Sequence, residues 1–153
     1  MRFFLFDRII SFSDIETIGV KCITAGEDFF SKHYDKKRIM PESLLIESLA
    51  QVGGWSITVR SEFRLFAIMC MVNNVKYYKL VKPGDRLFLR TNIIEFDKHQ
   101  AIITGEILSD GEKVVTIERI TYILVEIPKD YREEVKRRYL FVSEGLPGGY
   151  RGE

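Results

Sequence analysis

Hydrophobic and polar positions change their spacing twice along the chain, and each change predicts a different kind of element. Apolar runs at 3–12 and 16–24 indicate two strands. A helix is predicted to begin at Pro41, because proline suits the first turn of a helix. After Arg64 the spacing becomes period two, with many β-branched and aromatic residues, which is typical of strands. We expect these later strands at 65–78, 86–96, 100–108 and 113–127.

The predicted helix carries small and apolar residues around most of its circumference. Two adjoining faces share this character, formed by Leu45, Leu49, Val52 and Ser56 and by Leu44, Ser48, Gln51 and Trp55. A helix of this kind is buried on nearly all sides. Gly53 and Gly54 lie inside it, and each costs about 1 kcal/mol relative to alanine in a helix. We therefore expect another backbone to pass close to these two glycines.

The order of elements predicts the fold class. One long helix, buried on most sides between antiparallel strands, implies a curved sheet wrapped around that helix, which is an α+β architecture. A single helix cannot cover both faces of a doubly wound parallel sheet. We assign residues 1–128 to this domain. Residues 129–153 are predicted to form a C-terminal helical extension and a flexible tail, with Tyr131, Val135 and Tyr139 at helical spacing.

Composition and charge exclude several classes of protein. The 153 residues suit one domain, and 23 basic against 22 acidic residues give no general electrostatic case for nucleic-acid binding. Two cysteines, Cys22 and Cys70, cannot build a disulfide scaffold or a cysteine-rich zinc site, and we expect them to be small buried side chains in strands. No apolar run is long enough to cross a membrane or to form a secretory signal. We therefore expect a cytoplasmic protein with reduced thiols.

Glu47 lies in the middle of the predicted buried helix, where a charge is unusual. An unpaired buried carboxylate costs several kcal/mol. One interpretation is that Glu47 lies on a narrow exposed strip, or accepts a hydrogen bond from Gln51 or a neighbouring loop. The other interpretation is functional, because a carboxyl group in an apolar setting can act as a general acid.

Two histidines are present, and their positions differ. His33 lies in the loop that enters the helix, fourteen residues before Glu47, whereas His99 lies in a predicted surface turn. A loop imidazole together with a helix carboxylate would place a base and an acid around one apolar tunnel. The helix N-terminus at 41–44 adds backbone N–H donors that suit a developing oxyanion.

The segment from His33 to Gln51 resembles the active-site segment of hot-dog-fold 3-hydroxyacyl-acyl-carrier-protein dehydratases. The shared features are the His-to-Glu spacing, Met40-Pro41, the apolar run into Glu47, and Ala50-Gln51. The resemblance extends to 4–8 and 74–85 and covers most of the chain up to residue 128. The chain departs from the pattern after His33, where Tyr-Asp-Lys replaces Phe-Pro-Gly, and at Glu42, which replaces a glycine.

The resemblance implies a hot-dog fold and a dehydratase of acyl thioesters in fatty-acid or related acyl-chain synthesis. His33 would remove the C2 proton of a 3-hydroxyacyl chain, and Glu47 of the partner subunit would protonate the departing hydroxyl. Glu42, Ser43 and Gln51 would position the thioester. The family needs no metal or organic cofactor. It implies a homodimer, with a trimer of dimers as the larger alternative, and a substrate delivered by acyl carrier protein.

Basic residues cluster in two places that such a carrier could recognise. The candidate docking residues are Lys36, Lys37, Arg38, Lys76, Lys79 and Lys82. Acyl carrier protein is acidic, so these residues would accelerate association. The alternative interpretation is a solvated strand edge, which lysines protect against aggregation; Arg86 and Arg90 extend the second cluster in the same way.

Two other functions stay open from the sequence. A hot-dog thioesterase would use Glu47 to activate water and would not need His33. A non-catalytic module that binds acyl chains or acyl carrier protein would keep the tunnel without the chemistry, and Glu42 together with the altered loop after His33 favours it.

Overall fold

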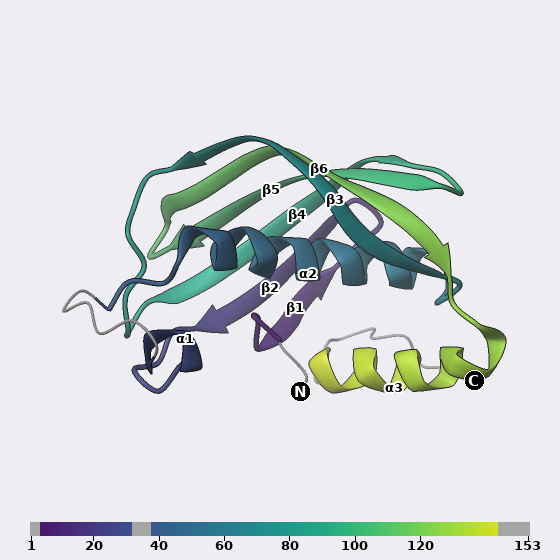
Figure 1. Cartoon of the computed structure of the whole chain (residues 1–153), viewed down its shortest axis with the longest axis horizontal. Coiled ribbons are helices and arrows are strands. Elements are labelled where there is room, and N and C mark those ends of the chain that lie inside the picture. Colours follow the sequence, from purple (N-terminus) through teal and green to yellow (C-terminus); the bar gives the residue numbers. More distant parts are fainter. Residues whose placement is uncertain (1–3, 32–37, 144–153) are drawn as a thin grey trace.

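A six-stranded antiparallel sheet curves around one long helix, α2 (Figure 1). The structure is a computed structural model that describes residues 4–31 and 38–143. The sheet has the order β1-β2-β4-β5-β6-β3, so that β1 and β3 are its edges. The elements are β1 (Arg8–Phe12), β2 (Glu16–Cys22), α1 (Asp28–Ser31), α2 (Glu42–Arg60), β3 (Leu65–Tyr77), β4 (Arg86–Phe96), β5 (Gln100–Ser109), β6 (Glu112–Glu126), a 3-10 turn (Lys129–Tyr131) and α3 (Arg132–Val142). The predicted α+β architecture is confirmed.

Short turns connect the later strands and fix their register. Asp110 and Gly111 both have positive φ between β5 and β6, which is the geometry of a tight hairpin turn. Between β4 and β5, the Asp97 carboxylate accepts the backbone N–H groups of His99 and Gln100 at 2.7 and 2.9 Å. The exposed His99 is therefore a turn residue, as predicted.

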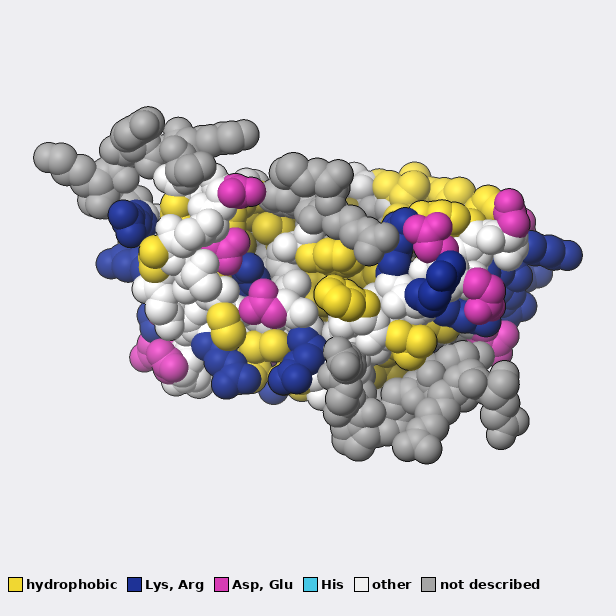
Figure 2. All heavy atoms as spheres, turned by 90° about the horizontal axis from the view of Figure 1, so that it is seen from below, with side chains coloured by type: hydrophobic (Ala, Val, Ile, Leu, Met, Phe, Trp, Pro, Cys, Tyr) yellow, Lys and Arg dark blue, Asp and Glu magenta, His cyan; other side chains and the backbone are white. Residues whose placement is uncertain are grey.

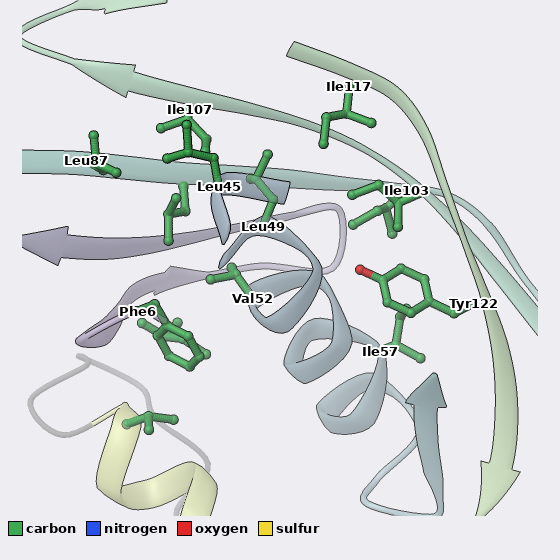
Figure 3. Packing of buried hydrophobic residues seen from close by; sticks show 14 of the residues in the cluster. Phe6, Leu45, Leu49, Val52, Ile57, Leu87, Ile103, Ile107, Ile117 and Tyr122 are labelled. Atoms are coloured by element: carbon green, nitrogen blue, oxygen red, sulfur yellow. The ribbon is translucent and has the colours of Figure 1, made fainter. Parts of the chain in front are cut away.

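Helix α2 lies in the concave side of the sheet and forms the centre of the core. Leu45, Leu49, Val52 and Ile57 are buried and point among side chains of the strands (Figure 3). A Cβ on Gly53 would lie 2.2 Å from Ile103 Cδ1, so side chains crowd this position. The expectation of a neighbouring backbone was wrong at Gly53, and only Gly54 faces strand backbone.

The residues directly before β1 do not form part of a strand. The prediction of a strand at 3–12 was wrong for the described residues 4–7, where the backbone N–H of Leu5 donates to Gln51 Oε1 of α2 at 2.9 Å instead of to a strand. The N–H of Asp7 then donates to Val20 O at 2.8 Å, and β1 starts one residue later. The segment is thus attached to the helix as well as to the sheet.

Both cysteines are exposed, which corrects the expectation that they are buried. Cys70 lies where the β3 register shifts between Met69 and Met71, so the alternation of inward and outward side chains is interrupted there. Cys22 is the last residue of β2, and the Asp7 carboxylate accepts its backbone N–H at 2.6 Å. Period-two spacing alone does not show a bulge or the end of a strand.

Helix α3 packs on the core from the side of α2 that faces away from the sheet (Figure 1). Val135, Tyr139 and Val142 are buried at helical spacing. The Tyr139 ring lies 5.8 Å from Trp55 and 5.7 Å from Phe63, measured between centroids. The domain boundary at residue 128 stays a prediction. Within the described residues, no helix has the length and apolar character that a membrane span requires.

Candidate active site

A cavity of about 460 Å³ lies between α2, β3 and the C-terminal helical segment. Glu47 and Gln51 of α2 line it, and Gly54, Trp55 and Thr58 continue the same wall toward the C-terminal end of the helix. Residues 66–69 of β3 form a second wall. A largely apolar cavity with a few convergent polar groups is the usual form of a small-ligand site.

Glu47 and Gln51 form a hydrogen-bonded pair in this cavity. Gln51 Nε2 donates to Glu47 Oε1 at 3.0 Å, as expected for residues one helical turn apart. Gln51 Oε1 in turn accepts the backbone N–H of Leu5 at 2.9 Å. The Gln51 amide is therefore held from both ends, and it holds the carboxylate at the cavity wall. The predicted hydrogen bond and a functional position of Glu47 are compatible.

Tyr122 was missed by the sequence analysis, although it also lines the cavity. Its hydroxyl points toward α2 (Figure 3) and donates to Ala50 O at 2.9 Å. Burial, and then the charge of Glu47, raise the pKa of the Tyr122 hydroxyl far above its ordinary value. Tyr122 is thus a neutral donor beside the carboxylate. No local signal reveals it, because it lies 72 residues from its acceptor.

The N-terminal turn of α2 opens to a different hollow. Glu42 is exposed and lines a hollow of about 250 Å³ together with Tyr77 and Tyr78 at the end of β3. Burial, and then the Glu42 charge, raise the pKa of Tyr77. Pro41 at the N-cap makes no side-chain hydrogen bond to the first turn of α2, where the N–H groups of Glu42 and Ser43 lie. Among the described residues, Glu42 and Ser43 do not line the Glu47 cavity.

At this N-terminal turn, the chain just after Arg38 lies beside the segment 79–82. Met40 N–H donates to Val81 O at 2.9 Å, which places the segment after Arg38 beside the segment between Lys79 and Lys82. Arg38 and Lys82 are exposed, whereas Lys79 Nζ lies 3.4 Å from a Glu112 carboxylate oxygen. Lys76 is exposed on β3. His33, Lys36 and Lys37 lie outside the described residues.

Arg90 does not belong to a basic edge. Its strand β4 lies inside the sheet between β2 and β5, so the interpretation of this region as a strand edge was wrong for β4. The Arg90 guanidinium lies 3.3 Å from Glu16 and 2.9 Å from Glu106. On the face of the molecule seen in Figure 2, acidic and basic side chains are interspersed, and apolar side chains reach the surface between them.

The described residues contain no cluster of three histidine, cysteine or acidic side chains that could hold a metal ion. This result does not test the predicted absence of a cofactor, which stays a prediction. The acid–base chemistry available in the cavity comes from Glu47, with Gln51 and Tyr122 as neighbouring neutral groups.

Comparison with known proteins connects this cavity to a family. A family model described as FabA-like domain matches residues 1–118. The 3-hydroxyacyl-acyl-carrier-protein dehydratase FabZ of Bacillus subtilis is 36% identical over 126 residues, which cover 81% of this chain and 89% of that protein. The enzyme of the same name from Syntrophobacter fumaroxidans is 35% identical over 123 residues, covering 75% of this chain and 84% of that protein. The family resemblance inferred from the sequence is confirmed.

Solved structures of low sequence identity share the fold. The protein smu.793 of Streptococcus mutans, bound to acetyl CoA, has a TM-score of 0.65 at 15% identity and covers 84% of this chain and 96% of its own. A hypothetical thioesterase of Streptococcus pneumoniae with coenzyme A has a TM-score of 0.62 at 14% identity, with 78% and 88% covered. These likenesses confirm the predicted hot-dog fold and carry no statement on activity.

Proposed function

We propose, because the chain belongs to the FabA-like family, that it dehydrates 3-hydroxyacyl thioesters of acyl carrier protein to trans-2-enoyl thioesters. The names and identities of its relatives support this activity. The observation that carries the proposal is the Glu47 carboxyl, which a helix holds at the wall of a largely apolar cavity. Such a cavity suits an acyl chain, and the carboxyl suits proton transfer to a leaving hydroxyl.

Each catalytic group has a defined part in the reaction. His33 takes the proton from C2, and the electron pair of that bond forms the double bond between C2 and C3. The C3–O bond breaks, and the hydroxyl leaves as water with the proton of Glu47. Gln51 is a positioning residue, since its amide touches the Glu47 carboxylate and is itself fixed by Leu5.

The thioester carbonyl is assigned to the first turn of α2. The backbone N–H groups of Glu42 and Ser43 are the donors, because a first helical turn has no intrahelical acceptors for them. The Glu42 side chain is directed to the hollow beside Tyr77, which supports a role for its backbone alone. Replacement of the family's glycine by glutamate therefore retains the donor.

A homodimer built on β3 would bring the two halves of this site together. The free edge of β3 is 13 residues long, its start lines the Glu47 cavity, and its end lines the hollow that contains Glu42. Two β3 strands paired antiparallel about a twofold axis place the start of one strand beside the end of the other. Glu47 of one chain then approaches the first turn of α2 in the second chain. A trimer of dimers is the larger alternative.

Exposed apolar residues on this edge support the same pairing. Phe66 and Ile68 are each 50% exposed, and their partners across the sheet, Val125 and Ile123, are exposed beside them. A long apolar edge strand is a site for pairing with another chain unless something covers it. A second copy of this chain would pair with the backbone groups at the β3 edge and would bury the exposed apolar side chains.

The basic surface around the N-terminal turn of α2 is proposed to receive acyl carrier protein. Arg38 and Lys82 come together there through the backbone bond between Met40 and Val81. We include Lys36, Lys37, Lys76 and Lys79 in this surface. An acidic carrier bound here would deliver its arm beside the thioester donors. The cytoplasmic location inferred from the sequence stays a prediction.

The activity is tested with purified protein and two substrates. A 3-hydroxyacyl-carrier protein and the matching 2-enoyl form are incubated with it, and mass spectrometry follows loss or gain of water and release of free acid. Interconversion of the two supports the proposal. Free acid without interconversion points to a thioesterase, and no reaction points to a binding module; either result overturns the dehydratase.

The site assignment needs separate variants. Glu47→Gln and His33→Ala are each expected to lower kcat by roughly 10²–10⁴-fold. His99→Ala is the control, because that histidine lies in an exposed turn, and it should retain wild-type activity. Dehydration at the wild-type rate by either active-site variant would contradict its role.

Subunit mixing tests the shared site. Glu47→Gln and His33→Ala subunits are unfolded together, refolded, and assayed. In a mixed dimer one site receives both intact residues and the other receives neither, so about a quarter of the wild-type activity should return. A site made within one chain would recover nothing, and that outcome would refute the dimer arrangement but not the reaction.

A further inference from the structure

Helix α3 supplies one wall of the Glu47 cavity. Val135 and Arg138 of α3, and Tyr131 of the 3-10 turn directly before it, line the cavity together with residues of α2 and β3. The match to the family model ends at residue 118, so this wall comes from a segment beyond the family domain. The catalytic groups and the wall therefore belong to different parts of the chain, and the wall can change without altering the proposed chemistry.

The wall is firmly attached. Val135 and Tyr139 are each 2% exposed, and the Tyr139 ring contacts both Trp55 and Phe63. The Arg138 guanidinium is paired with Glu134 and lies 5.3 Å from the centre of the Tyr131 ring, so the cavity-lining residues also hold one another. Contacts of this kind fix the depth of the cavity.

The α2 wall of the cavity extends well beyond its reactive residues. Glu47 and Gln51 lie at one end of the α2 wall, and Thr58 lies eleven residues further, about 16 Å along the helix axis at 1.5 Å per residue. An acyl chain whose C3 hydroxyl is at Glu47 and that follows this wall shares the cavity with Tyr131, Val135 and Arg138 of the C-terminal segment. The closing side chains then limit the chain length.

We propose that α3, together with the turn before it, is the chain-length selector of this enzyme, and that Val135 and Tyr131 determine the longest acyl group that the cavity accepts. This inference rests on the proposed function. It assigns to the C-terminal segment a role in substrate choice and none in proton transfer. Because neither residue touches the reacting atoms, their variants should change which chains react and should preserve the rate for short chains.

The experiment compares kcat/KM over a series of 3-hydroxyacyl-carrier proteins of increasing chain length. Val135→Ala should raise kcat/KM roughly tenfold for a chain two carbons longer than the preferred one, as expected when two more methylene groups become buried. Val135→Leu should lower kcat/KM for that longer chain. Leu140→Ala is the matched control on the same helix, since Leu140 is 50% exposed and is not a lining residue.

A second variant and a second measurement keep the inference testable. Tyr131→Ala enlarges the cavity at a side chain that is already partly exposed, so it should fold even if Val135→Ala does not. Displacement of the fluorescent fatty acid cis-parinaric acid by free fatty acids of increasing length reports the same cut-off without catalysis. An unchanged length profile in both Tyr131→Ala and the folded Val135 variants overturns the role of α3. If the wild type is inactive but the variants shift the length profile of displacement, only the proposed dehydratase activity is overturned, and the role of α3 stands.

Discussion

Alanine at Gly53 and at Gly54 should change the stability of the protein in opposite directions. Both glycines lie inside α2, and each alanine gains about 1 kcal/mol of helix propensity. The difference lies in the surroundings of the added methyl group. At Gly54 its nearest neighbours are Ala67 Cβ and O at 3.9 Å, which is ordinary contact. Gly54→Ala should therefore raise Tm by about 2–4 °C for a chain of this size.

At Gly53 the added methyl group has no room. It would lie 2.2 Å from Ile103 Cδ1 and 2.8 Å from Tyr122 Oη, and both of these side chains are fully buried. Overpacking of a core costs about 1–3 kcal/mol, and displacement of the Tyr122 hydroxyl from Ala50 O adds a buried unsatisfied group worth about 1–3 kcal/mol. After the helix gain is subtracted, the net loss is about 1–5 kcal/mol.

Thermal unfolding followed by circular dichroism measures both changes. Gly53→Ala should lower Tm by several degrees, and adding Ile103→Val should restore part of the loss, because it removes the clashing methyl group. Equal stabilisation by the two alanines would refute the packing argument. If Gly53→Ala combined with Ile103→Val loses more stability than the two single variants lose together, Ile103 Cδ1 is not the clashing atom.

Three further predictions concern the edge, the core and a turn. Ile68→Lys on the free edge of β3 should convert the dimer to a monomer in light scattering, whereas Ile94→Lys, at a similarly exposed site, should not; equal behaviour would contradict pairing through β3. Thr17→Val removes the buried hydrogen bond to Ser56 Oγ at 3.0 Å and should cost about 1–3 kcal/mol in urea unfolding, with most of it recovered by adding Ser56→Ala. Two backbone N–H groups lower the pKa of Asp97, so its stabilisation should be complete above about pH 4 and disappear as the pH falls through the folded pKa; a loss in Asp97→Ala that is independent of pH would contradict this.

Elements that depend on neighbouring residues were predicted well from the sequence. Helix α2 begins at Glu42, directly after the predicted start at Pro41, and the four later strands lie within one or two residues of their predicted bounds. Period and turn residues determine such elements locally. The buried face of Leu45, Leu49 and Val52 was correct for the same reason.

Features that depend on strand order were not predictable in the same way. The short distance in sequence from Lys76 to Arg90 predicts one basic edge, yet β4 lies inside the sheet and β3 at its edge. The bulge at Cys70 is a shift in the register of β3 against β6, some fifty residues away. Hydrogen bonding between distant segments determines both outcomes, and spacing within one segment carries no information on it.

The candidate site shows the same division between local and distant determinants. Glu47 and Gln51 are one turn apart on one helix, so the sequence could indicate both the carboxylate and its partner. Tyr122 and Val135 reach the cavity from 75 and 88 positions beyond Glu47, and the helical spacing around Val135 predicted a helix without showing what it covers. A protein that keeps its catalytic carboxyl and the amide that positions it on one helix can therefore preserve that part of its site while its substrate range changes through segments elsewhere in the chain. Sequence similarity to the relatives within α2 is therefore informative about the reaction. The acyl-chain length that the protein accepts requires a separate comparison of α3.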